Sequence, residues 1–226
     1  MLDERLSLAA SLYEPCALGA DIGTDHGLLP CHLLRQGICQ RMIFADVSAK
    51  ALAHAREQVE HQRLVDRAKL ICADGLDALT EPCGCVSVMG MGGETIAGIL
   101  TRGQDKLQGA VLVLSAHTDL HLVRQAVQEI GYHIVREELC RAAGRFYVVW
   151  RAEPGAAAMS TEDIRFGPLL MQHMSPMLQA YITWRVAVLS DRLNGLLSAR
   201  EPDHAAIDAI QADLAYYRRK LEESPC

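Results

Sequence analysis

The residues best suited to chemistry lie in one short segment, residues 17–30, which reads ALGADIGTDHGLLP. An apolar run reaches Asp21 and breaks at Gly23, and a second apolar run with helical spacing begins at Leu28. This order of strand, turn and helix is typical of the start of a nucleotide-binding βαβ unit. Gly23 allows a ligand to approach the backbone closely. The carboxylates of Asp21 and Asp25 suit ammonium or hydroxyl groups better than phosphates.

The same segment excludes two common kinds of nucleotide site. The dinucleotide fingerprint G-x-G-x-x-G is absent, because Asp25 and Leu28 stand where that pattern requires glycine. The lysine of a Walker A phosphate loop is absent as well. The turn therefore predicts a nucleoside cofactor without a pyrophosphate group, and S-adenosylmethionine is the common one.

Acidic residues and a glycine also follow the next two predicted strands. The apolar segment 41–46 ends at Asp46, about where a carboxylate meets ribose hydroxyls in a nucleotide-binding sheet. The segment 68–72 is followed by Asp74 and Gly75. Because the carboxyl ends of parallel strands meet at one edge of a sheet, we expect these residues to share a site with the first turn. In S-adenosylmethionine enzymes the first turn holds the methionine part, the second carboxylate binds ribose and the third turn holds adenine.

A glycine-rich turn, Gly90-Met91-Gly92-Gly93, follows the predicted strand 85–89. One interpretation is a flexible turn that begins the next helix. We favour a functional interpretation, in which this backbone lines the methyl group and its acceptor, because glycine allows a planar acceptor to come close.

Histidines and cysteines do not form a metal-ligand pattern. His117 and His121 have i, i+4 spacing, but no nearby acidic residue completes a zinc motif. Cys83 and Cys85 are the closest cysteine pair and have no second pair beside them. We therefore expect no metal and mostly buried free thiols. His26, in the first turn, can instead contact cofactor or substrate.

Strands that alternate with helical patterns position these residues. They predict an α/β fold with a doubly wound, mainly parallel sheet, closed by an antiparallel hairpin. The predicted elements are helix 3–13, strand 17–22, helix 28–34, strand 41–46, helix 48–62, strands 68–72 and 85–89, helix 94–100, strand 109–115, helix 119–130, and strands 132–140 and 146–151.

A break in composition at residues 153–158, EPGAAA, predicts the boundary between two domains, 1–155 and 160–226. Beyond this break, two apolar stripes with heptad-like spacing predict an antiparallel helical hairpin. Arg218 and Arg219 near its end have two interpretations. They contact phosphates, or they form a solvated helix end that complements the helix dipole.

Composition limits the class of protein. The chain has 226 residues, 50% of them hydrophobic, and a net charge of −6. No run approaches the roughly 18 apolar residues of a membrane span, and the N-terminus lacks the charge pattern of a secretory signal. These features favour a cytoplasmic protein. The acidity disfavours indiscriminate binding of nucleic acid but leaves room for a local basic face.

Several segments resemble the bacterial tRNA adenine-22 N1-methyltransferase family. The resemblance covers essentially the whole chain, and DIGTDHG followed by LP, together with GMGG, is far more specific than a generic cofactor fingerprint. The matching segments are Arg5-Leu6, DIGTDHGLLP (21–30), ADG (73–75), MGMGGETI (89–96), LVL (112–114) and the terminal helical hairpin.

The resemblance implies a Rossmann-like methyltransferase domain with a C-terminal coiled-coil appendage that helps to grip tRNA. It implies methyl transfer from S-adenosylmethionine to N1 of an adenine in the D-arm region, adenine 22. The implied cofactor-binding residues are Arg5, Asp21, Gly23, His26, Asp46, Asp74, Gly75, Gly90 and Met91. The candidate substrate-binding residues, from the glycine-rich turn, the loop after the fifth predicted strand and the last helix, are Gly92, Gly93, Ser115, Arg218 and Arg219. The candidate catalytic residues are Asp25 and His117.

One departure concerns the loop after the fifth predicted strand. The family typically has Gln-Pro-Asn there, whereas this chain has Ser115-Ala116-His117. Two alternatives therefore stay open: a methyltransferase of a small molecule or another nucleobase, and an RNA-binding protein that has lost catalysis. We expect a tRNA partner, no membrane and no metal, and we favour a monomer.

Overall fold

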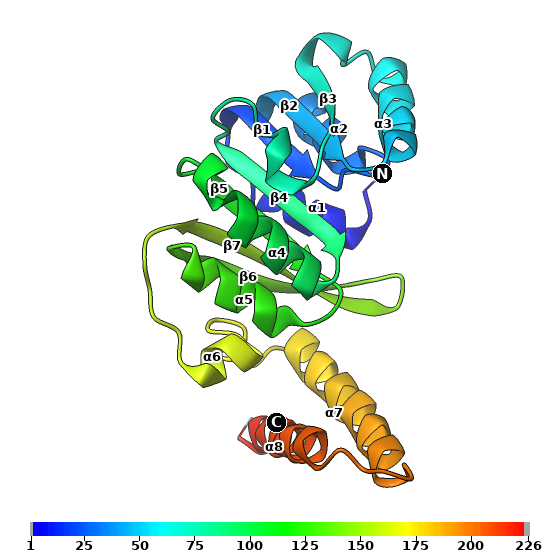
Figure 1. Cartoon of the computed structure of the whole chain (residues 1–226), viewed down its shortest axis with the longest axis vertical. Coiled ribbons are helices and arrows are strands. Elements are labelled where there is room, and N and C mark those ends of the chain that lie inside the picture. The colour runs from blue at the N-terminus through cyan, green and yellow to red at the C-terminus, as the bar shows by residue number, and fades with distance from the viewer. Residues whose placement is uncertain (1, 224–226) are drawn as a thin grey trace. The chain divides into compact units, whose positions relative to one another are not determined.

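The computed structural model describes residues 2–223 and contains one sheet of seven strands in the order β3-β2-β1-β4-β5-β7-β6 (Figure 1). The strands are β1 (Cys16–Ile22), β2 (Cys39–Asp46), β3 (Ala68–Cys72), β4 (Cys85–Met91), β5 (Val111–Ala116), β6 (Tyr132–Ala142) and β7 (Arg145–Pro154). The first five strands are parallel, and β7 pairs antiparallel with both β5 and β6. This confirms the predicted doubly wound sheet and its closing hairpin.

Helices connect the strands as the sequence predicts. They are α1 (Glu4–Ser11), α2 (Leu28–Arg35), α3 (Ala49–His61), α4 (Gly93–Gly103), α5 (Leu120–Glu129) and α6 (Thr161–Phe166), with short 3₁₀ turns at Val65–Arg67, Gly75–Ala78 and Gln104–Lys106. Asp3 and Ser48 cap α1 and α3, and each side chain accepts a hydrogen bond from a first-turn backbone N–H. Strand β2 is buried on both faces, since Met42 to Ala45 have no exposed surface.

Strand β4 differs from its prediction. The expected turn at Gly90-Met91 is the last part of the strand, where the register with β5 shifts between Met89 and Met91. Gly90 has a φ of 78° at this irregularity, a backbone conformation that favours glycine. The strand therefore bends at its carboxyl end.

The chain divides into two compact units, Met1–Leu170 and Met171–Cys226. The division lies later than the composition break on which the prediction of 1–155 and 160–226 rested. Helix α6 belongs to the first unit, because buried Arg124 donates to the carbonyls of Ile164 and Arg165 at 3.2 and 3.3 Å.

Glu137 holds the end of the same segment. Its carboxylate accepts the backbone N–H groups of Leu169 and Leu170 at 3.1 and 2.8 Å, and it pairs with Arg124 at 2.8 Å. Both charged side chains are almost completely buried, so they require these partners. Contacts of this kind cannot be read from a break in composition. The predicted boundary therefore lies earlier in the chain than the division after Leu170.

The second unit contains α7 (Pro176–Leu197) and α8 (His204–Glu222), the two helices that the apolar stripes predict. Ser175 and Asp203 cap them through side-chain oxygens. Leu178, Ile182 and Leu189 of the first predicted stripe are buried. Within residues 2–223, every helix is too short or too polar to cross a membrane.

Candidate functional site

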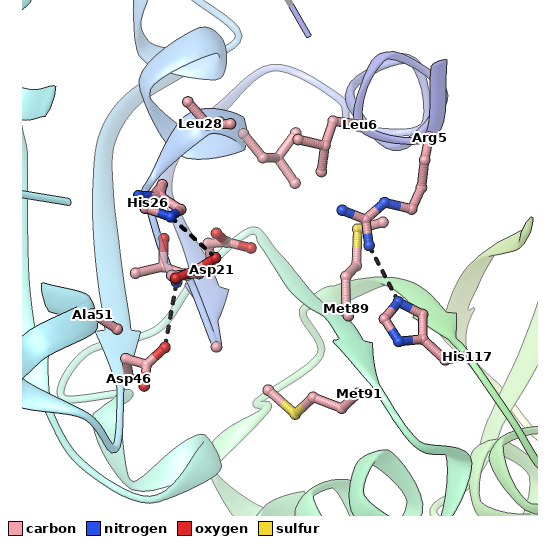
Figure 2. A pocket seen from close by; sticks show the side chains of 15 residues that line it. Arg5, Leu6, Asp21, His26, Leu28, Asp46, Ala51, Met89, Met91 and His117 are labelled. Carbon is pink, nitrogen blue, oxygen red and sulfur yellow. Dashed lines mark hydrogen bonds and ion pairs between the residues drawn. The ribbon is translucent and has the colours of Figure 1, made fainter. Parts of the chain in front are cut away.

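A cavity of about 520 Å³ opens at the carboxyl ends of the central strands (Figure 2). Its walls come from α1, the turn after β1, the starts of α2 and α3, and the ends of β2, β4 and β5. The lining residues are Arg5, Leu6, Asp21, Gly23, Thr24, Asp25, His26, Leu28, Leu29, Asp46, Ala51, Met89, Gly90, Met91 and His117. A cavity of this size is typical of small-ligand sites. It also lies beside the point where the strand order reverses between β1 and β4.

Asp21 is the buried carboxylate of the cavity, with 6% of its surface exposed. Ser87 of β4 donates to its Oδ1 at 2.5 Å, and the Tyr13 hydroxyl donates to Ser87 Oγ at 2.7 Å. This buried chain of hydrogen bonds joins the end of α1, β4 and β1. It holds the Asp21 carboxylate in one orientation at the cavity wall.

Burial raises the pKa of Asp21 above its ordinary value, and the hydrogen bond from Ser87 opposes that shift. A buried carboxylate of this kind is stabilised in its ionised form when a cationic group enters the cavity. The first turn therefore offers a site for an ammonium group.

Asp46 organises the turn after β1 through its two oxygens. Its Oδ2 accepts the backbone N–H of Asp25 at 3.3 Å, and its Oδ1 accepts that of Ser48 at 2.9 Å. Gly23 and Thr24 both donate to the carbonyl of Ala45, at 2.8 and 2.9 Å. These contacts bring the ends of β1 and β2 together beneath the cavity.

Gly23 is required by geometry. Its φ is 75°, and a Cβ at this position would lie 2.0 Å from the Met91 methyl carbon. A larger residue would be strained whatever the neighbouring side chain does. The Met91 methyl group fills the space beside Gly23, so the predicted close approach of a ligand requires the Met91 side chain to move aside.

The other side of the cavity carries Arg5 of α1 and His117, the residue after β5 (Figure 2). Arg5 Nη1 lies 3.4 Å from His117 Nε2. Both residues contact Tyr147 of β7: the Arg5 guanidinium is 5.3 Å from its ring centre, and the His117 ring is 5.9 Å away, edge to face. We call these three residues the Arg5 end of the cavity.

His117 is partly buried, and this burial lowers the pKa of its imidazole below the ordinary value. The charges of Arg5 and Arg145 lower it further. His117 is therefore neutral near pH 7, with one ring nitrogen as donor and the other as acceptor. Its backbone N–H donates to the carbonyl of Met91 at 2.9 Å, which joins the loops after β4 and β5.

Ser115 does not reach the cavity, contrary to its predicted role in substrate binding. It is completely buried, and its hydroxyl donates to the carbonyl of Val148 at 2.9 Å. This contact ties the Ser115 hydroxyl to the backbone of the neighbouring strand β7, so it is not available to a ligand in the cavity. The altered loop therefore presents His117 alone to a ligand.

Gly92 and Gly93 also lie outside the cavity wall. Gly92 is the N-cap residue of α4, and a Cβ at this position would lie 3.3 Å from Thr118 Oγ1. Gly93 is buried against the next loop, where a Cβ would lie 2.3 Å from the Asp119 carbonyl oxygen. These glycines allow α4 to pack closely on the loop after β5, and their role toward an acceptor stays a prediction.

Asp74 and Gly75 are not in the cavity wall either. Asp74 is exposed and forms an ion pair with Arg102 at 3.3 Å. Gly75 has a φ of 54° and packs against Ile99, which explains the glycine without a ligand. Strand β3 is two strands away from β1, so its end lies beyond the cavity. Contact of these residues with adenine stays a prediction.

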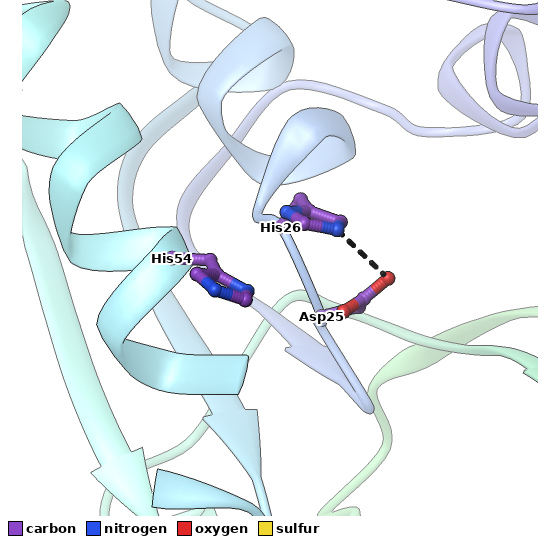
Figure 3. Close-up of side chains that lie close together, drawn as sticks. All are labelled: Asp25, His26 and His54. Carbon is purple, nitrogen blue, oxygen red and sulfur yellow. Dashed lines mark ion pairs between the residues drawn. The ribbon is translucent and has the colours of Figure 1, made fainter. Parts of the chain in front are cut away.

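Asp25, His26 and His54 form a cluster beside the cavity (Figure 3). His26 Nε2 lies 3.7 Å from Asp25 Oδ2, and the two imidazole rings stack at 4.9 Å with 10° between their planes. One ligand atom from each residue lies within 4.8 Å of the others. Parallel rings direct their nitrogen lone pairs along parallel planes, so one ion cannot meet both without rotation of a ring. The arrangement favours stacking over metal binding.

Sequence reasoning missed several residues of the site. Leu6, Thr24, Leu28, Leu29, Ala51 and Met89 line the cavity, and Tyr13, Ser87 and Tyr147 support it. Ser87 carried a signal, because it is the one polar residue inside the apolar run CVSVM. Tyr147 carried none, since alternation alone does not say which strand it will neighbour.

Arg218 and Arg219 belong to α8 of the second unit. Arg219 pairs with Glu223 at 3.6 Å and lies 5.5 Å from the centre of the Tyr216 ring. Arg218 lines a shallow depression between α7 and α8. Their predicted contact with tRNA phosphates stays a prediction.

Comparison with known proteins places these features in a family context. A family model described as tRNA (adenine(22)-N(1))-methyltransferase matches residues 19–215. The tRNA (adenine(22)-N(1))-methyltransferase of Bacillus subtilis is 30% identical over 156 residues, which span 68% of this chain and 66% of that protein, slightly under two thirds of its length.

Solved structures have the same fold. Streptococcus pneumoniae Sp1610 in complex with S-adenosyl-L-methionine is 28% identical, with a TM-score of 0.87 over 98% of this chain and all of that one. TrmK from M. capricolum, in complex with S-adenosyl-homocysteine, is 23% identical with a TM-score of 0.84 over 98% of both chains, and at that identity it shows a similar fold alone.

Proposed function

Because this chain belongs to the tRNA (adenine(22)-N(1))-methyltransferase family, we propose that it transfers a methyl group from S-adenosylmethionine to N1 of adenine 22 in the D-arm region of tRNA. The family model covers most of both compact units. The observation that carries the proposal is the cavity itself, which combines a buried carboxylate, a glycine turn and a neutral histidine at the carboxyl ends of β1, β2, β4 and β5.

The residues at the Asp21 side fit the proposed cofactor. Asp21 would hold the ammonium group of the methionine part, and Asp46 would accept ribose hydroxyls. Gly23 has no Cβ, so the cofactor can approach this turn closely once the Met91 side chain moves aside. Leu28 and Ala51 offer apolar surface for the adenine. The donor set thus matches a cofactor with an amino acid part, a ribose and a flat base, and no pyrophosphate.

The chemistry of the transfer makes modest demands on the protein. The bound cofactor supplies a methyl group on a positively charged sulfur, and adenine N1 has an in-plane lone pair that accepts it without prior loss of a proton. The chain must align the two reactants and exclude water. Since N1 lies on the pairing edge of the base, the adenine must be unpaired or flipped out of its helix.

The Arg5 end is the proposed acceptor site. The Arg5 guanidinium, which is also predicted to bind the cofactor, offers a planar group against which a base can stack, and the Tyr147 ring outside the cavity wall supports it. Neutral His117 can donate a hydrogen bond to the edge of the base or accept one from it. It adds no positive charge beside the developing cation. Asp25 lines the cavity from the opposite side, away from a base held at the Arg5 end, and its role in balancing that cation stays a prediction.

The test is methyl transfer from labelled cofactor to total tRNA, followed by digestion to nucleosides. We expect 1-methyladenosine, at adenine 22 in a sequenced tRNA, and much less of it with the Asp21→Asn variant at limiting cofactor concentration. A label on metabolite extracts but not on tRNA would support the small-molecule alternative. Retention of tRNA without turnover would support the non-catalytic RNA-binding alternative.

We also propose that the second unit engages tRNA through Arg218 and Arg219. In the full-length chain, Arg218→Glu together with Arg219→Glu should weaken tRNA binding about tenfold or more at low salt and leave cofactor affinity unchanged. Glu222→Gln together with Glu223→Gln, on the same helix, is the matched control. Equal tRNA affinity in the Arg variant and the wild type would contradict this role.

We infer that the protein acts in the cytoplasm, as a monomer and without a resident metal ion. Its proposed substrate is tRNA, and the chemistry above requires no Lewis acid. Sedimentation of the purified protein measures its oligomeric state, and activity after treatment with a chelator tests the need for a metal.

A further inference from the structure

Two cysteines lie side by side at the amino-terminal ends of neighbouring strands, the end of the sheet opposite the cavity. Cys16 begins β1 and Cys39 begins β2, and the parallel register pairs the two residues directly. Their Sγ atoms are 3.4 Å apart, and both are free thiols. Only a small movement separates this contact from a covalent S–S bond.

Two glycines make room for these thiols. A Cβ on Gly84 would lie 2.7 Å from the Cys16 Cβ, and a Cβ on Gly19 would lie 3.0 Å from the Cys39 Sγ. Neither glycine has a positive φ, so backbone conformation does not explain them. The space at Gly84 is occupied by Cys16, and the space at Gly19 is shared by Cys39 and by Met42, whose Sδ would lie 2.6 Å from a Cβ there.

The two thiols differ in the way that a reactive pair requires. Cys16 is partly exposed, whereas Cys39 is completely buried. The hydrogen bond from the Cys39 thiol lowers the pKa of Cys16, and the backbone N–H of Cys85 acts in the same direction against the effect of burial. The same contact with Cys16, together with burial, raises the pKa of Cys39. Cys16 is the accessible nucleophile and Cys39 is the sheltered second thiol.

We propose that Cys16 and Cys39 form a thiol–disulfide site that reacts with small disulfides, RS–SR. The Cys16 thiolate attacks one sulfur of RS–SR, a protein–SR bond forms and RS⁻ leaves. The Cys39 sulfur then attacks the sulfur of Cys16, and the proton of its thiol passes to the departing RS⁻, which leaves as RSH. Two protein thiols lose two electrons in total, and RS–SR is reduced to two thiols.

The bond would close a loop over residues 16–39, which contains β1, the turn with Asp21 and Gly23, and α2. A cross-link of this kind restricts the unfolded chain more than the folded one. Oxidised protein should therefore melt several degrees higher than reduced protein, by an amount on the order of 5–10 °C for this chain length.

The experiment treats the full-length protein with oxidised glutathione, quenches it in acid, and blocks the remaining thiols with an alkylating reagent. Cleavage by trypsin after Arg5, Arg35 and Arg41 leaves Cys16 in peptide 6–35 and Cys39 in peptide 36–41. We expect these two peptides to be joined after oxidation and separate after reduction. Fragment ions on each side of Cys31 show which cysteine of the first peptide carries the bond.

Variants separate this pair from its neighbours. In Cys39→Ser, Cys16 should accumulate as a stable glutathione adduct, because the second step has lost its nucleophile. Cys72→Ser, at an exposed cysteine, is the control that should leave the bond intact. Since Cys39 is buried, the wild-type peptide result stands even if its variant folds poorly.

Three outcomes would overturn the proposal: alkylation of both Cys16 and Cys39 after oxidation, a bond from Cys16 to Cys85, or a glutathione adduct on wild-type Cys16 that never resolves. None of these measurements involves methyl transfer. The proposal and the proposed function therefore stand or fall separately.

Discussion

The Asp21 end and the Arg5 end of the cavity are held by different kinds of contact. At the first, a buried carboxylate is fixed by Ser87 and Tyr13, beside a turn that only glycine can make. At the second, a helix residue meets a loop residue at 3.4 Å, with a half-buried tyrosine beside them. The hydrogen bond between Ser87 and Asp21 is short and buried, whereas the contact between Arg5 and His117 is longer and exposed to solvent.

This difference suits two kinds of ligand. A small cofactor of constant shape benefits from groups that are already oriented before it binds. A base in a large RNA is positioned partly by the rest of the RNA. Side chains that can change conformation on binding are therefore suited to contact it. The comparison predicts large, specific effects on cofactor affinity at the Asp21 end and effects on turnover at the Arg5 end.

The largest effect is expected at Asp21. Replacing it with Asn removes a charge-assisted interaction with the cofactor ammonium, which is worth roughly 1.5–3 kcal/mol. S-adenosylmethionine affinity should fall about 10- to 100-fold, with tRNA affinity unchanged. Calorimetric titration measures both, and Asp105→Asn, at an exposed residue outside the cavity, is the control. Wild-type cofactor affinity in folded Asp21→Asn protein would refute the assignment.

The same variant should not destabilise the protein. The pKa of Asp21 is raised in the folded chain, so the folded state binds its proton more tightly than the unfolded state does. The ionised carboxylate therefore costs stability, a cost that appears as pH rises above its ordinary pKa and is complete above the raised one. At neutral pH, Asp21→Asn should melt at the same or a higher temperature without cofactor. A clear fall in melting temperature would show that the carboxylate is structural.

The next largest loss of cofactor affinity is expected for Asp46→Ala. It removes the acceptor for the backbone of Asp25 and Ser48 as well as the proposed ribose contact. Cofactor affinity should fall about tenfold, a loss of roughly 1–2 kcal/mol for hydrogen bonds to a charged group. Asp46→Asn keeps part of this geometry and should lose less. Equal affinities for Asp46→Ala and the wild type would place the ribose elsewhere.

At the Arg5 end, His117→Ala should lower turnover about threefold to tenfold, the range of one neutral hydrogen bond of roughly 0.5–1.5 kcal/mol. Cofactor affinity should not change. His117→Asn, which restores an amide at this position, should keep turnover near that of the wild type.

The pH dependence sharpens this prediction. Because its pKa is lowered, His117 stays neutral to below its ordinary value near 6.5 and gains its charge only at lower pH. Wild-type turnover should fall there, since a cationic neighbour disfavours a cationic base, and His117→Asn should flatten the profile. Identical profiles for wild type, His117→Asn and His117→Ala would show that the loop does not touch the base.

The smallest effect is expected for Ser87→Ala, which acts through Asp21. Its hydroxyl opposes the rise in the pKa of Asp21, so its loss should raise that pKa further. Cofactor affinity should fall only a few-fold at neutral pH, about 1 kcal/mol or less. The loss of affinity on acidification should begin at a higher pH than in the wild type. An unchanged pH profile would mean that Ser87 has no influence on the carboxylate.

Local patterns in the sequence determined much of this protein. The alternation of strands and helices, the caps at Asp3 and Ser48, and the carboxylates at the ends of β1 and β2 were all predictable, because each depends on residues close together in the chain. The same is true of Gly23, whose turn is set by its own φ.

Only the tertiary structure decided which of these residues meet. Arg5 and His117 lie 112 positions apart, and they face each other because β4 and β5 follow β1 in the sheet beside α1. Strand order likewise leaves Asp74 outside the cavity, and it puts β7 beside β5, where the Val148 carbonyl holds the Ser115 hydroxyl. The physical reason is that periodicity specifies the face of an element, whereas register and strand order between distant segments specify its neighbours.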